Sequence, residues 1–383
     1  MSALYIHIPY CKRKCSYCDF FSVANTKSVE AYIAAVAKEA ALRKNELQGV
    51  PPRTIYIGGG TPSVLSASQM ERIVRGVAQA IPLHNVDEFT VEVNPEGVSP
   101  DYICALKALG VNRVSMGVQS LIDGELALIN RRHTAAQAVA AMRTIRAAGI
   151  SNISIDLIYG LPSQTHASWQ QSLREAIALQ PEHVSAYCLS YELGTRLTVM
   201  RDLGKITETS DEDCEQMFFT LVQTLKDAGY EHYELSNFAL PGRYSKHNSS
   251  YWDGTIYLGL GAAAHSFDGD TRSWNPRDIL AYTTAIEAGN LACEREILTA
   301  TDKYNEQIMT RLRTAKGISA DYIAAAHGEA ALRHFERAAA PFLASGKMLL
   351  SSGTYTITLP GLMTSDAIIS ELMTVSNSDS NPD

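Results

Sequence analysis

The first half of the chain alternates short β-rich runs with alanine-rich segments of helical spacing, and this alternation limits the fold more than any other feature. The β-rich runs are Leu4–Ile8, Thr54–Ile57, Phe89–Val93, Arg113–Val118, Ile153–Ile158 and Val184–Tyr187. The helical segments are Val29–Asn45, Ser66–Ala80, Ala135–Ala148 and Ala167–Leu179. Because parallel strands need such crossovers, the alternation predicts an α/β fold with a parallel sheet. Six units fit a partial (β/α)6 TIM-like barrel, although an open doubly wound sheet has the same pattern.

The alternation becomes irregular after about residue 194. We predict a βα core over residues 1–194, a barrel extension over 195–290, a small helical domain over 291–375 and a disordered tail over 376–383. In the small domain, three helical segments and a hairpin resemble a winged helix, but no basic recognition helix is present, which argues against DNA reading. The expected later elements are helices at Asp211–Ala228, Ala300–Thr314, Ile318–His327 and Leu332–Gly346, and a hairpin at Met348–Leu359.

Composition narrows the functional classes. The chain carries 33 Lys and Arg against 41 Asp and Glu, a formal net charge of −8, which argues against nucleic acid as a partner. No stretch approaches the roughly 20 apolar residues that span a bilayer, and Met1–Tyr5 lacks the features of a secretory signal. Seven cysteines, an odd number, argue against a disulfide framework and fit a reducing compartment. We therefore expect a cytoplasmic protein without membrane insertion.

Nearly every predicted strand is followed at once by small or polar residues. These segments are Ile8–Cys11, Gly58–Pro62, Glu92–Pro95, Gly117–Ser120, Asp156–Pro162 and Ser190–Glu192. In parallel α/β folds the carboxyl ends of the strands meet on one face, where ligands bind. The sequence therefore predicts that these segments converge on one large site.

Three cysteines, Cys11, Cys15 and Cys18, follow the first predicted strand with the spacing C-x3-C-x2-C. The basic run Lys12–Lys14 lies between the first two, which indicates a polar loop. A disulfide would leave one thiol unpaired, and a tetrahedral zinc ion would need a fourth ligand from elsewhere. A cubane iron–sulfur cluster suits thiolate ligands, and with three cysteines one iron stays open to a substrate or cofactor. Zinc, a redox pair and chance spacing are the alternatives.

The segments Tyr5–Cys11 (YIHIPYC) and Cys15–Cys18 (CSYC) resemble the radical S-adenosylmethionine (radical SAM) superfamily, in its coproporphyrinogen oxidase-like branch. The resemblance implies a [4Fe–4S] cluster held by the three cysteines, whose open iron is chelated by the amino and carboxylate groups of SAM. It also implies that an electron from the cluster splits the sulfonium into methionine and a 5′-deoxyadenosyl radical. The protein would hold the sulfonium near the cluster and exclude water and oxygen.

The same resemblance assigns a SAM site. The glycine run Gly58–Pro62 lets backbone approach a ligand closely, although an ordinary tight turn is the alternative. The SAM-contact positions of the family are matched by Tyr5, Tyr17, Gly59, Gly60, Thr61, Glu92, Gln119, Arg131 and Asp156, with Ser190 as a last backbone contact. Glu92 and Asp156 suit an ammonium group or ribose hydroxyls, and Arg131 suits the SAM carboxylate. Taken singly, an acid at a strand end is more often a helix cap or a surface charge.

Three features separate the haem chaperones of this branch from the oxidases. The oxidases have a further cysteine two residues after the third ligand, where this chain has Phe20. They also have a long N-terminal extension, whereas this chain reaches its cysteine loop within eleven residues. His247-Asn248-Ser249-Ser250-Tyr251-Trp252 matches the H-N-x-x-Y-W signature of the chaperones. The resemblance covers essentially the whole chain.

The H-N-x-x-Y-W segment is the candidate haem site. Imidazole is a natural axial ligand of haem iron, so His247 is the best candidate for a haem contact. Tyr251 and Trp252 could stack on a flat macrocycle. The alternative is that His247 and Asn248 order the loop while the aromatic residues pack on the barrel. His7 and His265 are further candidates as ligands or lining residues.

The sequence therefore supports the hypothesis of a cytoplasmic haem-trafficking protein with a SAM-binding [4Fe–4S] cluster. It would bind haem and pass it by protein contact to acceptor haemoproteins, such as membrane respiratory enzymes. The rival hypothesis is an oxygen-independent coproporphyrinogen III oxidase, in which the radical takes a hydrogen from each of two propionate side chains before carbon dioxide leaves. A third hypothesis makes the cluster structural, stabilising the fold or promoting a homodimer.

Overall fold

The computed structural model describes residues 2–374, and its largest element is a 12-stranded sheet. Six parallel strands form the centre of the sheet. They are β1 (Ser2–Ile8), β2 (Thr54–Gly59), β3 (Glu88–Val93), β4 (Arg113–Gln119), β5 (Asn152–Tyr159) and β6 (His183–Cys188). They lie side by side in chain order, without the reversal of order that defines a doubly wound sheet. The predicted α/β fold with a partial (β/α)6 barrel is confirmed.

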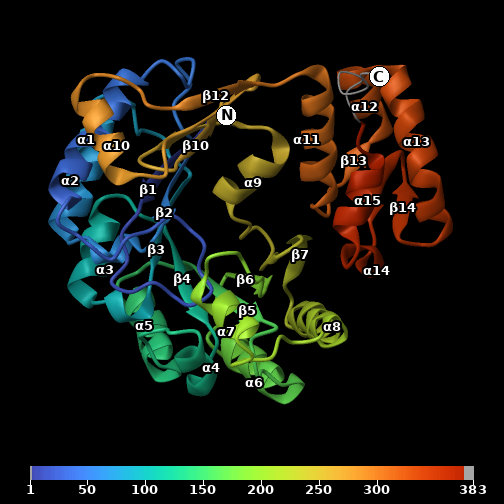
Figure 1. Cartoon of the computed structure of the whole chain (residues 1–383), viewed down its shortest axis with the longest axis horizontal. Coiled ribbons are helices and arrows are strands. Elements are labelled where there is room, and N and C mark those ends of the chain that lie inside the picture. Colours follow the sequence, from blue (N-terminus) through green and yellow to red (C-terminus); the bar gives the residue numbers. More distant parts are fainter. Residues whose placement is uncertain (1, 375–383) are drawn as a thin grey trace.

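Helices connect the parallel strands, and Figure 1 shows several of them along the outside of the sheet. They are α1 (Val29–Leu42), α2 (Ala67–Ala78), α3 (Pro100–Ala108), α4 (Asp123–Leu128), α5 (Ala135–Ala147) and α6 (His166–Ala178). In α2, for example, Met70, Ile73 and Val77 are buried at helical spacing. A capping box starts this helix, with Ser66 Oγ accepting the N–H of Gln69. Each predicted helix forms where the spacing indicates; α3 and α4 were not predicted.

Strands from the second half of the chain widen the sheet at both edges. They are β7 (Glu231–Glu234), β8 (Asn237–Ala239), β9 (Ile256–Leu260), β10 (His265–Phe267), β11 (Thr271–Trp274) and β12 (Glu294–Ile297). β9 pairs in parallel with β1, and β8 pairs in antiparallel fashion with β6. Because β12 pairs with β11, the sheet continues past residue 290, so the predicted domain boundary there falls inside it.

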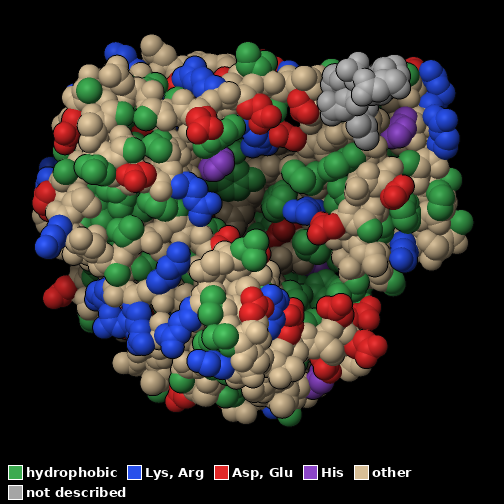
Figure 2. Space-filling model, in the orientation of Figure 1, with side chains coloured by type: hydrophobic (Ala, Val, Ile, Leu, Met, Phe, Trp, Pro, Cys, Tyr) green, Lys and Arg blue, Asp and Glu red, His purple; other side chains and the backbone are tan. Residues whose placement is uncertain are grey.

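The helices of this middle region are α7 (Arg196–Asp202), α8 (Asp211–Asp227), α9 (Lys246–Asp253) and α10 (Ile279–Glu287). The predicted helix from Asp211 forms as α8, and Ser210 caps it by accepting the N–H of Asp213. Figure 2 shows the molecule hollowed at the centre of one face, between the places that α9 and β6 occupy in Figure 1. The hollow therefore lies on the side where the six-stranded barrel wall does not close.

The C-terminal unit has its own hydrophobic core and its own small sheet of order β13-β15-β14. Its elements are α11 (Ala300–Leu312), β13 (Ile318–Ser319), α12 (Ala320–His327), α13 (Glu329–Ala344), β14 (Met348–Ser351), β15 (Thr354–Ile357), α14 (Leu359–Leu362) and α15 (Ser365–Leu372). The three predicted helices and the hairpin are therefore observed, and the winged-helix-like arrangement is confirmed. An ion pair between Arg272 and Glu306 and a hydrogen bond from Leu235 N to Arg313 O (3.0 Å) connect the unit to the barrel.

The predicted tail at 376–383 lies outside the described residues. The other domain boundaries, at residues 194 and 375, stay predictions. Within residues 2–374, none of the helices combines the length and the apolar character needed to cross a bilayer.

Candidate functional site

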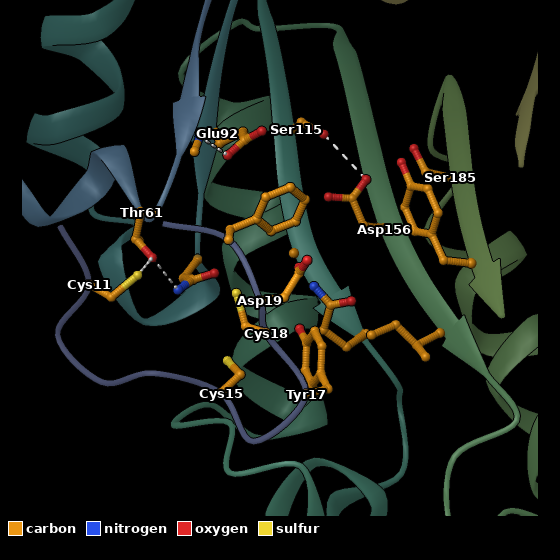
Figure 3. A pocket seen from close by; sticks show the side chains of 18 of the residues that line it. Cys11, Cys15, Tyr17, Cys18, Asp19, Thr61, Glu92, Ser115, Asp156 and Ser185 are labelled. Carbon is orange, nitrogen blue, oxygen red and sulfur yellow. Dashed lines mark hydrogen bonds between the residues drawn. The ribbon is translucent and has the colours of Figure 1, made fainter. Parts of the chain in front are cut away.

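A cavity of about 470 Å³ lies at the carboxyl ends of the parallel strands. All the residues predicted to contact SAM line it, as do the three cysteines of the loop. These are Tyr5, Tyr17, Gly59, Gly60, Thr61, Glu92, Gln119, Arg131 and Asp156, together with Cys11, Cys15 and Cys18. In Figure 3 the cysteines lie on the loop at one side, and Asp156 and Ser185 lie on strands across from them. The expected convergence of the strand ends is therefore observed, although it does not show what binds there.

The cysteine loop leaves β1 and returns to it. Val23 N donates to Pro9 O at 2.8 Å, and Cys11 N donates to Val23 O at 3.0 Å. This closure keeps Cys11, Cys15 and Cys18 on one wall of the cavity (Figure 3). Burial raises the pKa of the Cys18 thiol to about 11. Its thiolate form therefore needs a cation or a metal centre beside it.

A chain of hydrogen bonds joins two of the cysteines. Cys11 Sγ lies 3.4 Å from Thr61 Oγ1, which accepts a hydrogen bond from Asn94 Nδ2 at 3.2 Å. Asn94 Oδ1 accepts from Arg131 Nη2 at 2.7 Å, and Arg131 Nη1 donates to Cys15 Sγ at 3.4 Å. Arg131 and Asn94 therefore link the sulfur of Cys15 to the hydroxyl group beside Cys11. The sequence analysis placed Asn94 in the converging segment Glu92–Pro95 but gave it no role of its own.

Arg131, predicted to meet the SAM carboxylate, is engaged with protein groups. Besides Asn94 and Cys15, its guanidinium donates to the carbonyl oxygen of Gly117. In this structure Arg131 therefore holds the cysteine loop against the ends of β3 and β4. Its contact with SAM stays a prediction.

The glycine run packs tightly against the end of β1. Gly59 has a φ of +110°, and a Cβ atom there would lie 2.3 Å from Cε1 of His7. The His7 ring is itself fixed, because Nδ1 lies 2.9 Å from Tyr5 Oη and Nε2 lies 3.2 Å from Phe21 O. Gly59 N also donates to Glu92 Oε2 at 3.0 Å. Only glycine satisfies both the backbone conformation and this close approach.

Two partly buried carboxyl groups face the cavity from β3 and β5. Glu92 accepts a hydrogen bond from Tyr56 Oη at 2.8 Å, and Asp156 accepts one from Ser115 Oγ at 3.4 Å (Figure 3). Burial raises the pKa of Glu92 to about 7; the Tyr56 hydrogen bond opposes the rise and the Asp156 carboxyl adds to it. Burial also raises the pKa of Asp156, against hydrogen bonds from Ser185 and Ser115. A cationic ligand would favour the ionised form of both groups.

The structure places His247 away from the cavity, in the wall behind it. Its side chain is 0% exposed, and both ring nitrogens have partners: Thr54 Oγ1 at 2.9 Å from Nδ1, and Tyr251 Oη at 2.9 Å from Nε2. The ring also stacks on Tyr56, with 5.1 Å between the centroids. Burial lowers the pKa of His247 to about 3, and the charge of Arg113 acts in the same direction. In this conformation no ring nitrogen is available to haem iron.

In the rest of the H-N-x-x-Y-W segment, the residues that line the cavity are not those that were predicted to contact a ligand. Tyr251 and Trp252 are partly buried and are not among the lining residues, and Tyr251 packs edge-to-face on Tyr257 at 4.8 Å. Asn248, to which the alternative gave only a loop-ordering role, lines the cavity from α9. The geometry therefore agrees with the alternative in which His247 and its neighbours order α9. A role in haem binding stays a prediction.

The residues of the cysteine loop fit an iron–sulfur cluster. Each of the seven cysteines is a free thiol, and Arg131 already faces the sulfur of Cys15. Within residues 2–374, no three His, Cys, Asp or Glu side chains are grouped around one point as ligands of a single metal ion would be. A cubane cluster does not require such a group, because each cysteine binds a different iron.

Known proteins resemble this chain in sequence and in fold. Residues 5–176 match the model of the Radical SAM superfamily, and residues 298–364 match that of the HemN C-terminal domain. The chain is 37% identical over 318 residues to the haem chaperone HemW of Lactococcus lactis, covering 83% of each chain. It is 30% identical over 375 residues to HemW of Mycobacterium tuberculosis, covering 97% of this chain and 94% of the relative. The solved structure of coproporphyrinogen III oxidase (HemN) from Escherichia coli matches with a TM-score of 0.85 and 24% identity, covering 97% of this chain and 90% of the other.

The parallel barrel, the three-cysteine loop at its carboxyl end and the HemN-type C-terminal unit together define a radical SAM protein. Membership of this superfamily implies SAM and a [4Fe–4S] cluster as cofactors. The likeness to the oxidase, at 24% identity, shows the fold alone, whereas the likeness to the chaperones extends over most of both sequences. The chain belongs to the family of the haem chaperone HemW.

Proposed function

We propose that this protein binds haem and transfers it to acceptor haemoproteins, and that it carries a SAM-binding [4Fe–4S] cluster. One observation supports the proposal most strongly. Three free thiols and the predicted SAM-contact residues line a single cavity in a chain that belongs to the HemW family.

Cys11, Cys15 and Cys18 would hold the cluster, and Arg131 would stabilise the thiolate of Cys15. When bound, the cluster supplies an electron to the sulfonium of SAM. The glycine run would receive the methionine end of SAM by backbone contact, and Glu92 and Asp156 would meet its ammonium group or ribose hydroxyls. The protein would also exclude water, because these groups lie inside the barrel wall.

Acceptor haemoproteins, such as membrane respiratory enzymes, would receive the haem through protein contact. We propose that this exchange takes place in the cytoplasm and that the protein forms a homodimer. A haem contact at His247 would require α9 to leave its present position, since both ring nitrogens are hydrogen-bonded. Tyr251 is tied to the same arrangement through its hydroxyl group.

Haem titration of the anaerobically reconstituted protein tests the proposal. We expect saturable binding of ferric or ferrous haem, followed by its appearance in a haem-depleted acceptor protein. Haem bound to serum albumin at the same concentration is the control for passive exchange. Transfer no faster than from albumin would contradict the chaperone proposal.

The fold match to the oxidase supports a second candidate, the oxygen-independent oxidation of coproporphyrinogen III. Against it, Phe20 occupies the position of the oxidases' further cysteine, and its side chain, 65% exposed, lines the cavity. Incubating the reconstituted protein with coproporphyrinogen III, SAM and a reductant distinguishes the two. The chaperone proposal predicts no vinyl product, and product at catalytic turnover would establish the oxidase instead.

A further inference from the structure

A buried arginine side chain lines the cavity and is not among the residues of the predicted SAM site. Arg113 begins β4 and lines the cavity, although its side chain is only 1% exposed. Its Nε atom has no hydrogen-bond partner among the residues that the structure describes. The nearest ion contact of this guanidinium is Nε to Glu88 Oε2, at 3.9 Å. A buried charge without hydrogen bonds is costly, so Arg113 requires an explanation.

Glu88 does not neutralise Arg113 by a close pair, because its carboxylate serves α9. Lys246 N and His247 N each donate to it at 2.9 Å. These bonds satisfy the free N–H groups at the start of α9 and hold the helix against the barrel. Arg113 is therefore left with a long contact to a carboxylate whose two oxygens already accept hydrogen bonds from α9.

Other polar side chains around Arg113 have partners of their own. Ser154 Oγ lies 2.7 Å from His183 Nδ1. Asp156 accepts from Ser115, and the charge of Arg113 helps to hold down its pKa against the rise caused by burial. Of the other two arginines at the cavity, Arg131 is engaged with the cysteine loop and Arg13 is exposed on that loop. Arg113 is thus the buried guanidinium at the cavity that can accept a new anionic partner.

Asn248, on α9, is a second hydrogen-bond donor at the cavity. It lines the same cavity from α9, and it is the member of the H-N-x-x-Y-W segment that does so. A guanidinium presents parallel N–H donors that match a carboxylate, and a side-chain amide supplies a further N–H.

We propose that Arg113 and Asn248 form a subsite for a carboxylate group of the ligand that occupies the cavity. The proposal rests on the proposed function, which offers two sources of a carboxylate: the methionyl group of SAM and the propionate side chains of haem. The cavity is lined by Asn248 of α9 and by Ser185 and Tyr187 of β6, and Figure 2 shows a hollow between the places that these two elements occupy in Figure 1. The subsite would give the H-N-x-x-Y-W segment a contact with ligand through its asparagine.

The experiment compares haem with haem dimethyl ester, in which both propionates are blocked, and measures SAM separately. All three are titrated into the full-length reconstituted protein and into Arg113→Gln, Asn248→Leu and Ser249→Ala. Ser249 is the matched control, because it lies next to Asn248 on α9 and its hydroxyl bonds only to Ser245 O at 2.8 Å. Arg113→Lys tests rescue by a retained charge.

If haem propionate is the source, the unmodified protein binds haem about tenfold or more tightly than the ester. Arg113→Gln and Asn248→Leu then reduce that preference, Arg113→Lys restores part of it, and SAM affinity is unchanged. If SAM is the source, the two variants weaken SAM binding instead. Unchanged affinity for both ligands in both folded variants would overturn the subsite. If the unmodified protein binds no haem, the proposed function fails, while the SAM titration still tests the subsite.

Discussion

Replacing Glu92 by Gln tests the electrostatic account of the cavity. Burial raises the pKa of Glu92 from 4.5 to about 7. Below pH 4.5 the carboxyl is protonated in both the folded and the unfolded protein, so it contributes no difference. Between pH 4.5 and 7 the unfolded chain loses this proton first, so the folded protein becomes less stable as the pH rises. Above pH 7 the cost of ionising the buried carboxyl is about 3 kcal/mol.

Glu92→Gln removes this titration and keeps the volume of the side chain. We expect the free energy of unfolding of the variant, relative to the unmodified apoprotein, to increase by about 2 kcal/mol between pH 5 and pH 8. Denaturant unfolding at several pH values measures the difference. Glu212→Gln, at an exposed position on α8, is the control and should show no such trend. A pH-independent difference for Glu92→Gln would refute the argument.

Three further substitutions test the geometry. Gly59→Ala should lower the free energy of unfolding by about 2 kcal/mol or more, since the new methyl group meets His7 and φ is positive; unaltered denaturant midpoints would contradict this. His247→Ala should destabilise the fold by about 2–4 kcal/mol through lost stacking on Tyr56 and lost hydrogen bonds; if stability holds and haem binding disappears, the buried role is wrong. Asn94→Ala should lower the cluster content after reconstitution, because it breaks the hydrogen-bond chain between two cysteines, and full cluster occupancy would show that the chain is dispensable.

The parallel barrel and the convergence of its strand ends could be predicted from the sequence, because both follow from local signals. Alternating β-rich and helical segments specify the βα units, and the cysteine spacing specifies the loop. The pairing of β9 with β1 could not be predicted, because Ser2 and Ile256 are far apart in the chain and parallel pairing leaves no local signal. The antiparallel pairing of β8 with β6 could not be predicted either, because His183 and Ala239 are far apart in the chain.

The sequence predicted which residues at the strand ends line the cavity, because their type and position both follow from the strand pattern. The site was predicted less well on α9, because the direction of a side chain depends on how the helix packs. Glu88 holds the start of α9 against the barrel, which turns His247 into the wall and Asn248 toward the cavity. Arg113 was not predicted because it lies at the beginning of β4, whereas ligand contacts are expected at the carboxyl ends of parallel strands.

The most direct test of the account is the iron and sulfide content of the anaerobically reconstituted protein, with electron paramagnetic resonance before and after addition of SAM. We expect about four irons and four sulfides per chain, a reduced-cluster signal that changes when SAM binds, and loss of the cluster in each of Cys11→Ala, Cys15→Ala and Cys18→Ala. Zinc in place of iron, or a four-iron cluster that survives in all three variants, would contradict the assignment of the cavity.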